Sequence, residues 1–276
     1  MNVPFAKMHG LGNDFVVIDQ RQLDYALSRT QLVHIADRRC GAGCDQLLFL
    51  EPPSDQRADA RYRVVNADGS PAEHCGNGIR CIARYIERVD GPRDSVTVEI
   101  GNSLYGLDFV AGDLVRVDMG VPNFEPSALP LTVPERRQRY TIELASQSLV
   151  FGAVSVGNPH AVIDVEAIED VDVVTLGTAL QKSSLFPASV NVGFAQFVAR
   201  DSLRLRVFER GVGETYACGT GACAAVAIGR LWGRLDEQVT VALRGGDLLI
   251  RWQGGENDRL SMTGPATFVF EGKFEL

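Results

Sequence analysis

Residues 209–225 read ERGVGETYACGTGACAA, a glycine-rich loop that passes into a helical pattern. After Gly221, small and apolar residues recur at positions 222, 225, 226 and 229, the spacing of one helix face. Cys218 therefore stands just before a helix, where unpaired backbone N–H groups and about half a positive charge collect. Such a position lowers the pKa of a thiol and attracts a carboxylate. We therefore expect this stretch to be a functional loop.

The same stretch occurs a second time in the chain. Residues 63–79, RVVNADGSPAEHCGNGI, align without a gap with residues 206–222, RVFERGVGETYACGTGA, which places Cys75 on Cys218. Farther out, GNDFVVID at 12–19 matches GNPHAVID at 157–164. A repeat of this length indicates two copies of one structural unit, each with a cysteine at the start of a helix.

Composition limits the possible functions. A chain of 276 residues is long enough for two domains with their own cores. The net charge is −8 and lysine occurs only at positions 7, 182 and 273, so no basic cluster is available for nucleic acid or an anionic lipid surface. Neither nucleic acid nor a membrane surface is therefore an expected partner.

The six cysteines are expected to be reduced thiols. The N-terminus lacks the basic start and apolar core of a signal peptide, and no apolar run reaches membrane-spanning length, which predicts a cytoplasmic protein. Cys40 and Cys44 have the spacing of half a zinc site, but no second Cys/His pair completes a tetrahedral set. We therefore predict no metal.

Four prolines between positions 122 and 134 mark a domain junction, since no regular element tolerates that spacing. We predict an N-terminal domain of residues 1–119 plus a returning tail, 264–276, and a C-terminal domain of residues 120–263. Strands outnumber helices, and several follow one another through glycine turns. The predicted class is α+β, with a curved, mostly antiparallel sheet around a long helix in each domain. Helices are expected at 28–38, from the first cysteine loop to about 89, at 172–182 and after 221.

Two equivalent domains would direct two helix N-termini, each with its thiol, at one ligand. One thiolate and one thiol on opposite faces of a carbon suit stereoinversion, because one removes the α-proton and the other protonates the opposite face. Backbone N–H groups of Gly76, Asn77, Gly219 and Thr220 would bind a carboxylate and stabilise the carbanion.

Four motifs in this order resemble the diaminopimelate epimerase family: KMHGLGNDF at 7–15, HCGNGIRC at 74–81, GNPH at 157–160 and ACGTGA at 217–222. The resemblance extends over essentially the whole chain. It implies a cofactor-independent isomerase that interconverts LL- and meso-2,6-diaminopimelate for lysine and cell-wall precursor synthesis, without pyridoxal phosphate. It also implies two pseudo-symmetric domains and a homodimer, although Phe270 stands where the family's pattern has a tyrosine at the dimer contact.

The resemblance also implies the roles of individual residues. Cys75 and Cys218 would be the acid/base pair, and His160 and Glu209 would tune a catalytic thiol. An arginine and several amides suit a substrate with two amino-acid ends, because they bind carboxylates and ammonium groups. The implied substrate-binding residues are Asn13, Gln46, Asn66, Gly76, Asn77, Asn158, Asn191, Glu209, Arg210, Gly219 and Thr220.

Other interpretations are weaker. Taken singly, each cysteine could be a buried core residue and each asparagine a turn residue, but their duplicate placement argues against this. Gly219-x-Gly221-x-x-Ala224 fits a dinucleotide fingerprint formally, yet strands and helices do not alternate as that fold requires. A papain-like hydrolase or a redox pair gives no reason for two matching cysteines. A zwitterion-binding module would need neither thiol, and a proline-racemase-like enzyme is the nearest rival.

Overall fold

The computed structural model describes residues 2–72, 76–144 and 148–276. The chain divides into two compact units, Met1–Val117 with Thr263–Leu276, and Asp118–Met262. The predicted boundaries, after residues 119 and 263, fall close to these. None of the helices in the described ranges is both long and apolar enough to cross a membrane.

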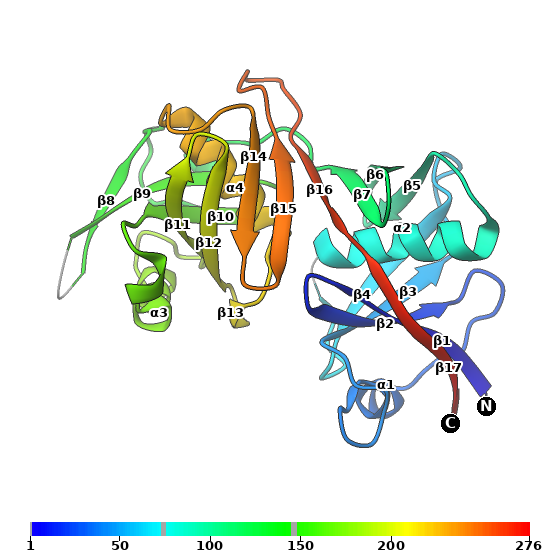
Figure 1. Ribbon diagram of the computed structural model, residues 1–276. Helices are drawn as coiled ribbons and strands as arrows, with labels where there is room; N and C mark the ends of the chain where they lie inside the picture. The colour runs from blue at the N-terminus through cyan, green and yellow to red at the C-terminus, as the bar shows by residue number, and fades with distance from the viewer. Residues whose placement is uncertain (1, 73–75, 145–147) are drawn as a thin grey trace. The chain divides into compact units, whose positions relative to one another are not determined.

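The first unit is one sheet with two helices (Figure 1). The tail strand β17 pairs with β1, and the order continues β1-β2-β3-β4-β5-β6-β7, antiparallel except for the parallel pairs β2–β3 and β4–β5. Its elements are β1 (Asn2–Gly10), β2 (Asn13–Asp19), α1 (Arg29–Ala36), β3 (Gln46–Glu51), β4 (Ala60–Asn66), α2 (Gly76–Asp90), β5 (Ser95–Ile100), β6 (Ser103–Phe109), β7 (Leu114–Asp118) and β17 (Thr267–Glu275).

The long helix α2 packs against this sheet because its apolar residues recur at helical spacing. Ile79, Ile82, Ala83 and Ile86 are fully buried, and the helix contacts β1, β2, β3, β5 and β17. Gly91 follows its last residue at a φ of 100°, a conformation that ends helices and favours glycine.

The second unit repeats the plan. The sheet order is β8-β9-β10-β11-β12, with both β13 and β14 pairing to β12 and β15 pairing to β14. Here β10–β11 and β12–β14 are the parallel pairs. The elements are β8 (Tyr140–Glu143), β9 (Ser148–Ser155), β10 (Pro159–Asp164), α3 (Val173–Gln181), β11 (Asn191–Ala199), β12 (Ser202–Glu209), β13 (Gly213–Thr215), α4 (Gly219–Leu231), β14 (Gln238–Leu243) and β15 (Gly246–Arg251), with short 3-10 helices at Pro126–Ala128 and Ile168–Asp170. The strand β16 (Ser261–Pro265) includes the last two residues of this unit and the first three of the returning tail.

The central helix α4 is surrounded by its sheet. Every residue from Gly219 to Gly229 is buried, and the helix contacts β9, β10, β11, β12 and β15. Small residues allow this close approach: a Cβ on Gly152 of β9 would lie 2.6 Å from Ile228 Cγ2. The α+β class with a curved sheet around a long helix in each unit is therefore confirmed.

Two local features are not predicted by the sequence pattern. Residues 2–19 form two antiparallel strands, β1 and β2, joined by a turn in which Leu11 and Gly12 have φ values of 55° and 82°. The short strand β13, which pairs back on β12, was not predicted. Both features depend on strand pairing across a tight turn, which hydrophobic periodicity does not report.

Candidate functional site

Cys218 is the N-cap residue of α4. Its backbone is extended, with φ −122° and ψ 107°, and the residue is 4% exposed. A Cβ on Gly221 would lie 2.9 Å from Val207 Cγ2 and 3.3 Å from the Cys218 sulfur. The third residue of the helix must therefore be glycine if the thiol is to keep its place.

The environment of Cys218 does not lower its pKa. Burial raises the pKa well above the usual value, and the neighbouring Glu209 carboxylate raises it further. The Thr220 hydroxyl and the Gly221 amide act in the opposite direction without overcoming burial. The expectation of a lowered thiol pKa at this helix start is therefore wrong for this conformation, in which Cys218 is a thiol.

Glu209, the last residue of β12, is hydrogen-bonded to Cys218. Burial raises the pKa of the Glu209 carboxyl, while hydrogen bonds from Thr215 and Cys218 lower it. The Thr215 hydroxyl donates to Glu209 Oε1. The buried thiol and the partly buried carboxylate thus form a hydrogen-bonded pair, in which one proton can pass between sulfur and oxygen.

A second chain of hydrogen bonds leads from His160 to the sulfur. Asn158 Nδ2 donates to Thr220 Oγ1 at 3.4 Å, and Thr220 Oγ1 lies 3.6 Å from Cys218 Sγ. The Asn158 oxygen therefore faces His160 Nε2, at 2.9 Å, and this nitrogen must carry the proton. Burial, with a smaller effect of Arg210, lowers the pKa of His160 to about 3, so the ring is neutral. Its Nδ1 has no hydrogen-bond partner among the described residues.

Asn191 holds the backbone of the site. Its Nδ2 donates to the Pro159 carbonyl at 3.1 Å, and its Oδ1 accepts the Arg210 backbone N–H at 2.9 Å. The residue is 4% exposed. Its bond to Pro159 uses one of the two amide hydrogens, so one N–H is left for any ligand. The Arg210 guanidinium donates to the Ala188 carbonyl at 3.3 Å.

The first unit gathers the matching amides. Gln46 Nε2 donates to Asn66 Oδ1 at 3.1 Å, because the two residues face each other across β3 and β4. Asn77, in the first turn of α2, donates from its Nδ2 to Asn13 Oδ1 at 3.4 Å. Cys75 lies outside the described residues, and Gly76 is the first residue of α2.

Three residues near these groups had no predicted role. Asp45 accepts Asn13 Nδ2 at 3.0 Å, and the fully buried Arg80 donates to Asn77 Oδ1 at 2.9 Å and to the Gly76 carbonyl at 3.1 Å. Thr215 is the third. Arg80 could have been identified from the sequence, because it is a charged residue within the apolar helical pattern that follows Cys75. No sequence pattern singles out Asp45 or Thr215.

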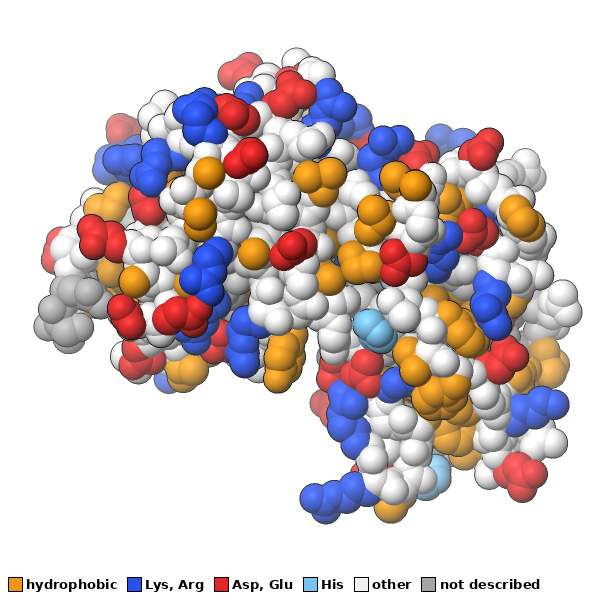
Figure 2. Space-filling model, viewed as in Figure 1, with side chains coloured by type: hydrophobic (Ala, Val, Ile, Leu, Met, Phe, Trp, Pro, Cys, Tyr) orange, Lys and Arg blue, Asp and Glu red, His pale blue; other side chains and the backbone are white. Residues whose placement is uncertain are grey.

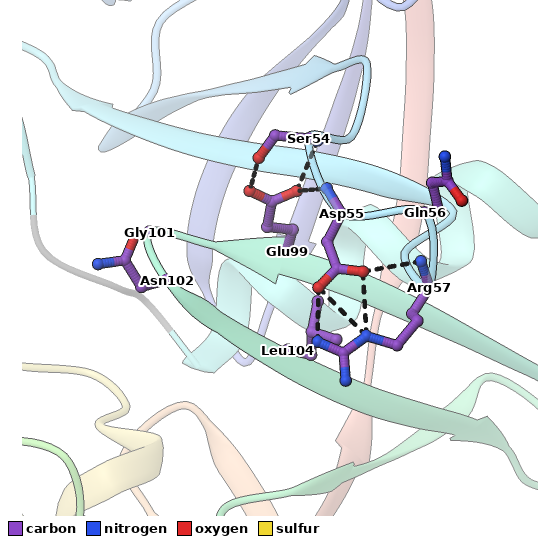
Figure 3. Close-up of a pocket in the computed structure, with 8 residues that line it drawn as sticks. All are labelled: Ser54, Asp55, Gln56, Arg57, Glu99, Gly101, Asn102 and Leu104. Atoms are coloured by element: carbon purple, nitrogen blue, oxygen red, sulfur yellow. Dashed lines mark hydrogen bonds and ion pairs between the residues drawn. The ribbon is translucent and has the colours of Figure 1, made fainter.

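Neither a metal-binding cluster nor the pocket of Figure 3 coincides with the candidate site residues that the structure describes. No group of three or more His, Cys, Asp or Glu side chains within the described ranges is arranged to hold a metal ion. An open pocket of about 580 Å³ lies between the 54–57 loop and the β5–β6 hairpin (Figure 3). In it, Glu99 accepts hydrogen bonds from Ser54 and from the Asp55 N–H, at 3.0 Å for the latter, so its role is to fix the loop. None of its lining residues is a predicted site residue.

Known proteins resemble this chain in sequence or in fold. A diaminopimelate epimerase from Alkalilimnicola ehrlichii is 49% identical, and one from Thioalkalivibrio sulfidiphilus is 48% identical, each over the full length of both chains. A hydroxyproline epimerase structure from Agrobacterium vitis matches the fold with a TM-score of 0.72 at 17% identity, covering 99% of this chain and 92% of that one. A PhzF-family phenazine biosynthesis protein from Bacillus anthracis matches with a TM-score of 0.70 at 16% identity over all of both chains.

The family model points to the same relatives. The model named "Diaminopimelate epimerase" matches residues 5–125 and 152–269, which include both copies of the cysteine motif. These residues also carry the His160–Cys218 hydrogen-bond chain and the amides of the first unit. The chain therefore belongs to the diaminopimelate epimerase family.

Proposed function

We propose that this chain is a cofactor-independent epimerase that interconverts LL- and meso-2,6-diaminopimelate, with Cys75 and Cys218 as the acid/base pair. One observation carries the proposal: the Cys218 thiol stands at a helix start beside a carboxylate that can take its proton. The repeat provides the second thiol at the equivalent position. Family membership and the names of the two relatives support the substrate.

The proposed reaction moves one proton on and one off the same carbon. In one direction the Cys75 thiolate removes the α-proton, and the Cys218 thiol protonates the carbanion on the opposite face. In the other direction the roles exchange: Cys75 is the thiol, Cys218 passes its proton to Glu209 and removes the α-proton as a thiolate, and Cys75 protonates the opposite face. The N–H groups at the starts of α2 and α4 stabilise the negative charge that develops on the substrate carboxylate. Each turnover leaves the total number of protons unchanged.

The remaining site residues would hold the two ends of the substrate. Arg210 suits a carboxylate through a bidentate contact, and the amides suit an ammonium group and a carboxylate. Asn191 would act by fixing the backbone of Arg210, and His160 by orienting Asn158 and Thr220. Substrate contacts are proposed for Asn13, Gln46, Asn66, Gly76, Asn77, Asn158, Asn191, Glu209, Arg210, Gly219 and Thr220.

We also propose a cytoplasmic homodimer. Apolar side chains gather over β1 and β17 on the face drawn in Figure 2, and Val269 and Phe270 of β17 are 52% and 46% exposed. An exposed apolar strand of this kind is typical of a protein–protein interface. The ring centroids of Phe270 and Phe5 are 6.0 Å apart. Phenylalanine therefore supplies an aromatic ring at the position where the family's pattern has a tyrosine.

The test is incubation with LL-diaminopimelate in heavy water without pyridoxal phosphate. We expect meso product with one deuterium at the inverted Cα, because protonation on the opposite face draws on solvent-exchanged thiols. No isomer interconversion by pure, reduced protein would contradict the proposal. Turnover of proline under the same conditions, with none of diaminopimelate, would favour the proline-racemase-like alternative.

A further inference from the structure

Thr215 faces Glu209 within the β12–β13 hairpin. In the antiparallel register Val207 lies opposite Thr215, and Glu209 lies opposite Gly213. Thr215 is therefore the diagonal neighbour of Glu209 on the same face of the hairpin. Gly213, at a φ of 99°, has no side chain to place across from Glu209. The carboxylate accordingly meets the Thr215 hydroxyl, which donates to its Oε1.

We propose that Thr215 is a positioning residue whose hydroxyl keeps the Glu209 carboxylate ionised and directed at the Cys218 thiol. The inference rests on the proposed function, in which Glu209 accepts the thiol proton. Thr215 would act through Glu209, because its hydroxyl hydrogen is committed to that carboxylate and a hydroxyl has one hydrogen to donate.

The charges around Glu209 make this neutral donor important. Glu209 is partly buried, which raises its pKa, and the hydrogen bonds from Thr215 and Cys218 lower it. Arg210 is the next residue along the chain, and His160 on β10 is neutral. Glu214 forms an ion pair with Arg206, with 2.7 Å between nitrogen and oxygen. It lies opposite Phe208 in the hairpin, so its side chain is on the other face from that of Glu209. Removing the Thr215 hydroxyl therefore removes stabilisation of the carboxylate without changing any charge.

The pair Thr215→Val and Thr215→Ser tests the proposal through the pH profile of kcat. Valine keeps the shape and loses the donor, so the pKa of Glu209 rises and the acid limb of kcat moves to higher pH. We expect a shift of about one pH unit, the size that a hydrogen bond to a charged group produces. Serine keeps the donor and should keep the limb of the unaltered protein. In a Glu209→Gln background the valine substitution should shift nothing further.

Thr220→Val is the matched control, because Thr220 contacts Cys218 whereas Thr215 contacts Glu209. Its hydroxyl lies 3.6 Å from the sulfur and lowers the pKa of Cys218. Removing it should move the basic limb, at which Cys218 loses its proton, to higher pH and leave the acid limb in place. Opposite limbs responding to two Thr→Val changes would separate a directed hydrogen bond from a general loss of packing.

A substrate-free measurement separates this inference from the proposed function. Infrared titration can follow the carboxylate band that is present in the unaltered protein and missing from Glu209→Gln. We expect the midpoint of this band to rise in Thr215→Val and not in Thr215→Ser. An unmoved midpoint, with kcat lowered equally at every pH, would overturn the inference. If the protein did not epimerise diaminopimelate, the proposed function would fail, and the infrared midpoint would still decide whether Thr215 controls Glu209.

Discussion

His160 on β10 pairs in parallel register with Asn191 on β11. In the other unit Phe15 pairs with Gln46, the residues that the repeat aligns with this pair. The second parallel pairing is repeated as well, since Ala60 opposite Val98 corresponds to Leu203 opposite Val241. Both copies therefore build their site residues on the same strand ends in the same register. The long helix α2 begins after β4, and α4 begins after the matching strand β12 and its short partner β13.

The first prediction concerns the two cysteines. Cys75→Ala and Cys218→Ala should each abolish epimerisation in both directions, because each removes the proton donor or acceptor on one face of the carbon. Isomer ratios after long incubation measure the activity, and circular dichroism with thermal unfolding verifies the fold. Near-normal turnover by either single variant would eliminate the two-base mechanism. Cys40→Ala, at an exposed thiol, is the control and should behave as the unaltered protein.

The second prediction concerns Arg210. Arg210→Met should weaken diaminopimelate binding by about 1.5–3 kcal/mol, because a bound carboxylate loses a charged hydrogen-bond partner. The effect on folding should be small, since Asn191 holds the backbone N–H of residue 210 rather than its side chain. Calorimetric titration and thermal unfolding separate the two effects. Unchanged affinity and turnover would place Arg210 outside the site.

A third expectation follows from the crowding at Gly221. In Gly221→Ala the added methyl group would press on Val207 and on the Cys218 sulfur, at 2.9 Å and 3.3 Å. We expect a stability loss of about 1–3 kcal/mol, typical of overpacking, together with a marked fall in kcat as the thiol is displaced. Gly106→Ala is the matched control, because a Cβ there meets no atom within 4 Å. Full activity of Gly221→Ala would show that the position of the sulfur is not critical.

The fourth prediction uses the pH dependence of stability. The pKa of His160 is lowered from 6.5 to about 3 by burial, so the folded protein holds its ring neutral while the unfolded chain takes up a proton. This contribution to stability is present above pH 6.5 and is lost as the pH falls toward 3, by up to about 1.4 kcal/mol per pH unit. Urea unfolding at several pH values should show the slope, and His160→Gln should lack it. An equal slope in both proteins would mean that other groups cause the acid sensitivity.

Much of the architecture follows from the amino-acid sequence alone. The repeat of the cysteine motif predicts two copies of one unit, and the apolar spacing after each motif predicts α2 and α4. The tail after residue 264 has no counterpart in the second copy, and it forms β17 against β1 in the first unit. These features are readable because local periodicity and self-similarity are properties of the chain itself.

The protonation state of Cys218 was decided by the tertiary structure. A helix start favours a thiolate, but burial of the sulfur beside Glu209 outweighs that effect, and burial depends on packing among β12, β13 and α4. The Thr215–Glu209 hydrogen bond depends likewise on the register of a strand that periodicity does not detect. The sequence therefore determines where the reactive groups stand along the chain. Their charges depend on which groups folding buries together, because desolvation and hydrogen bonding act through space.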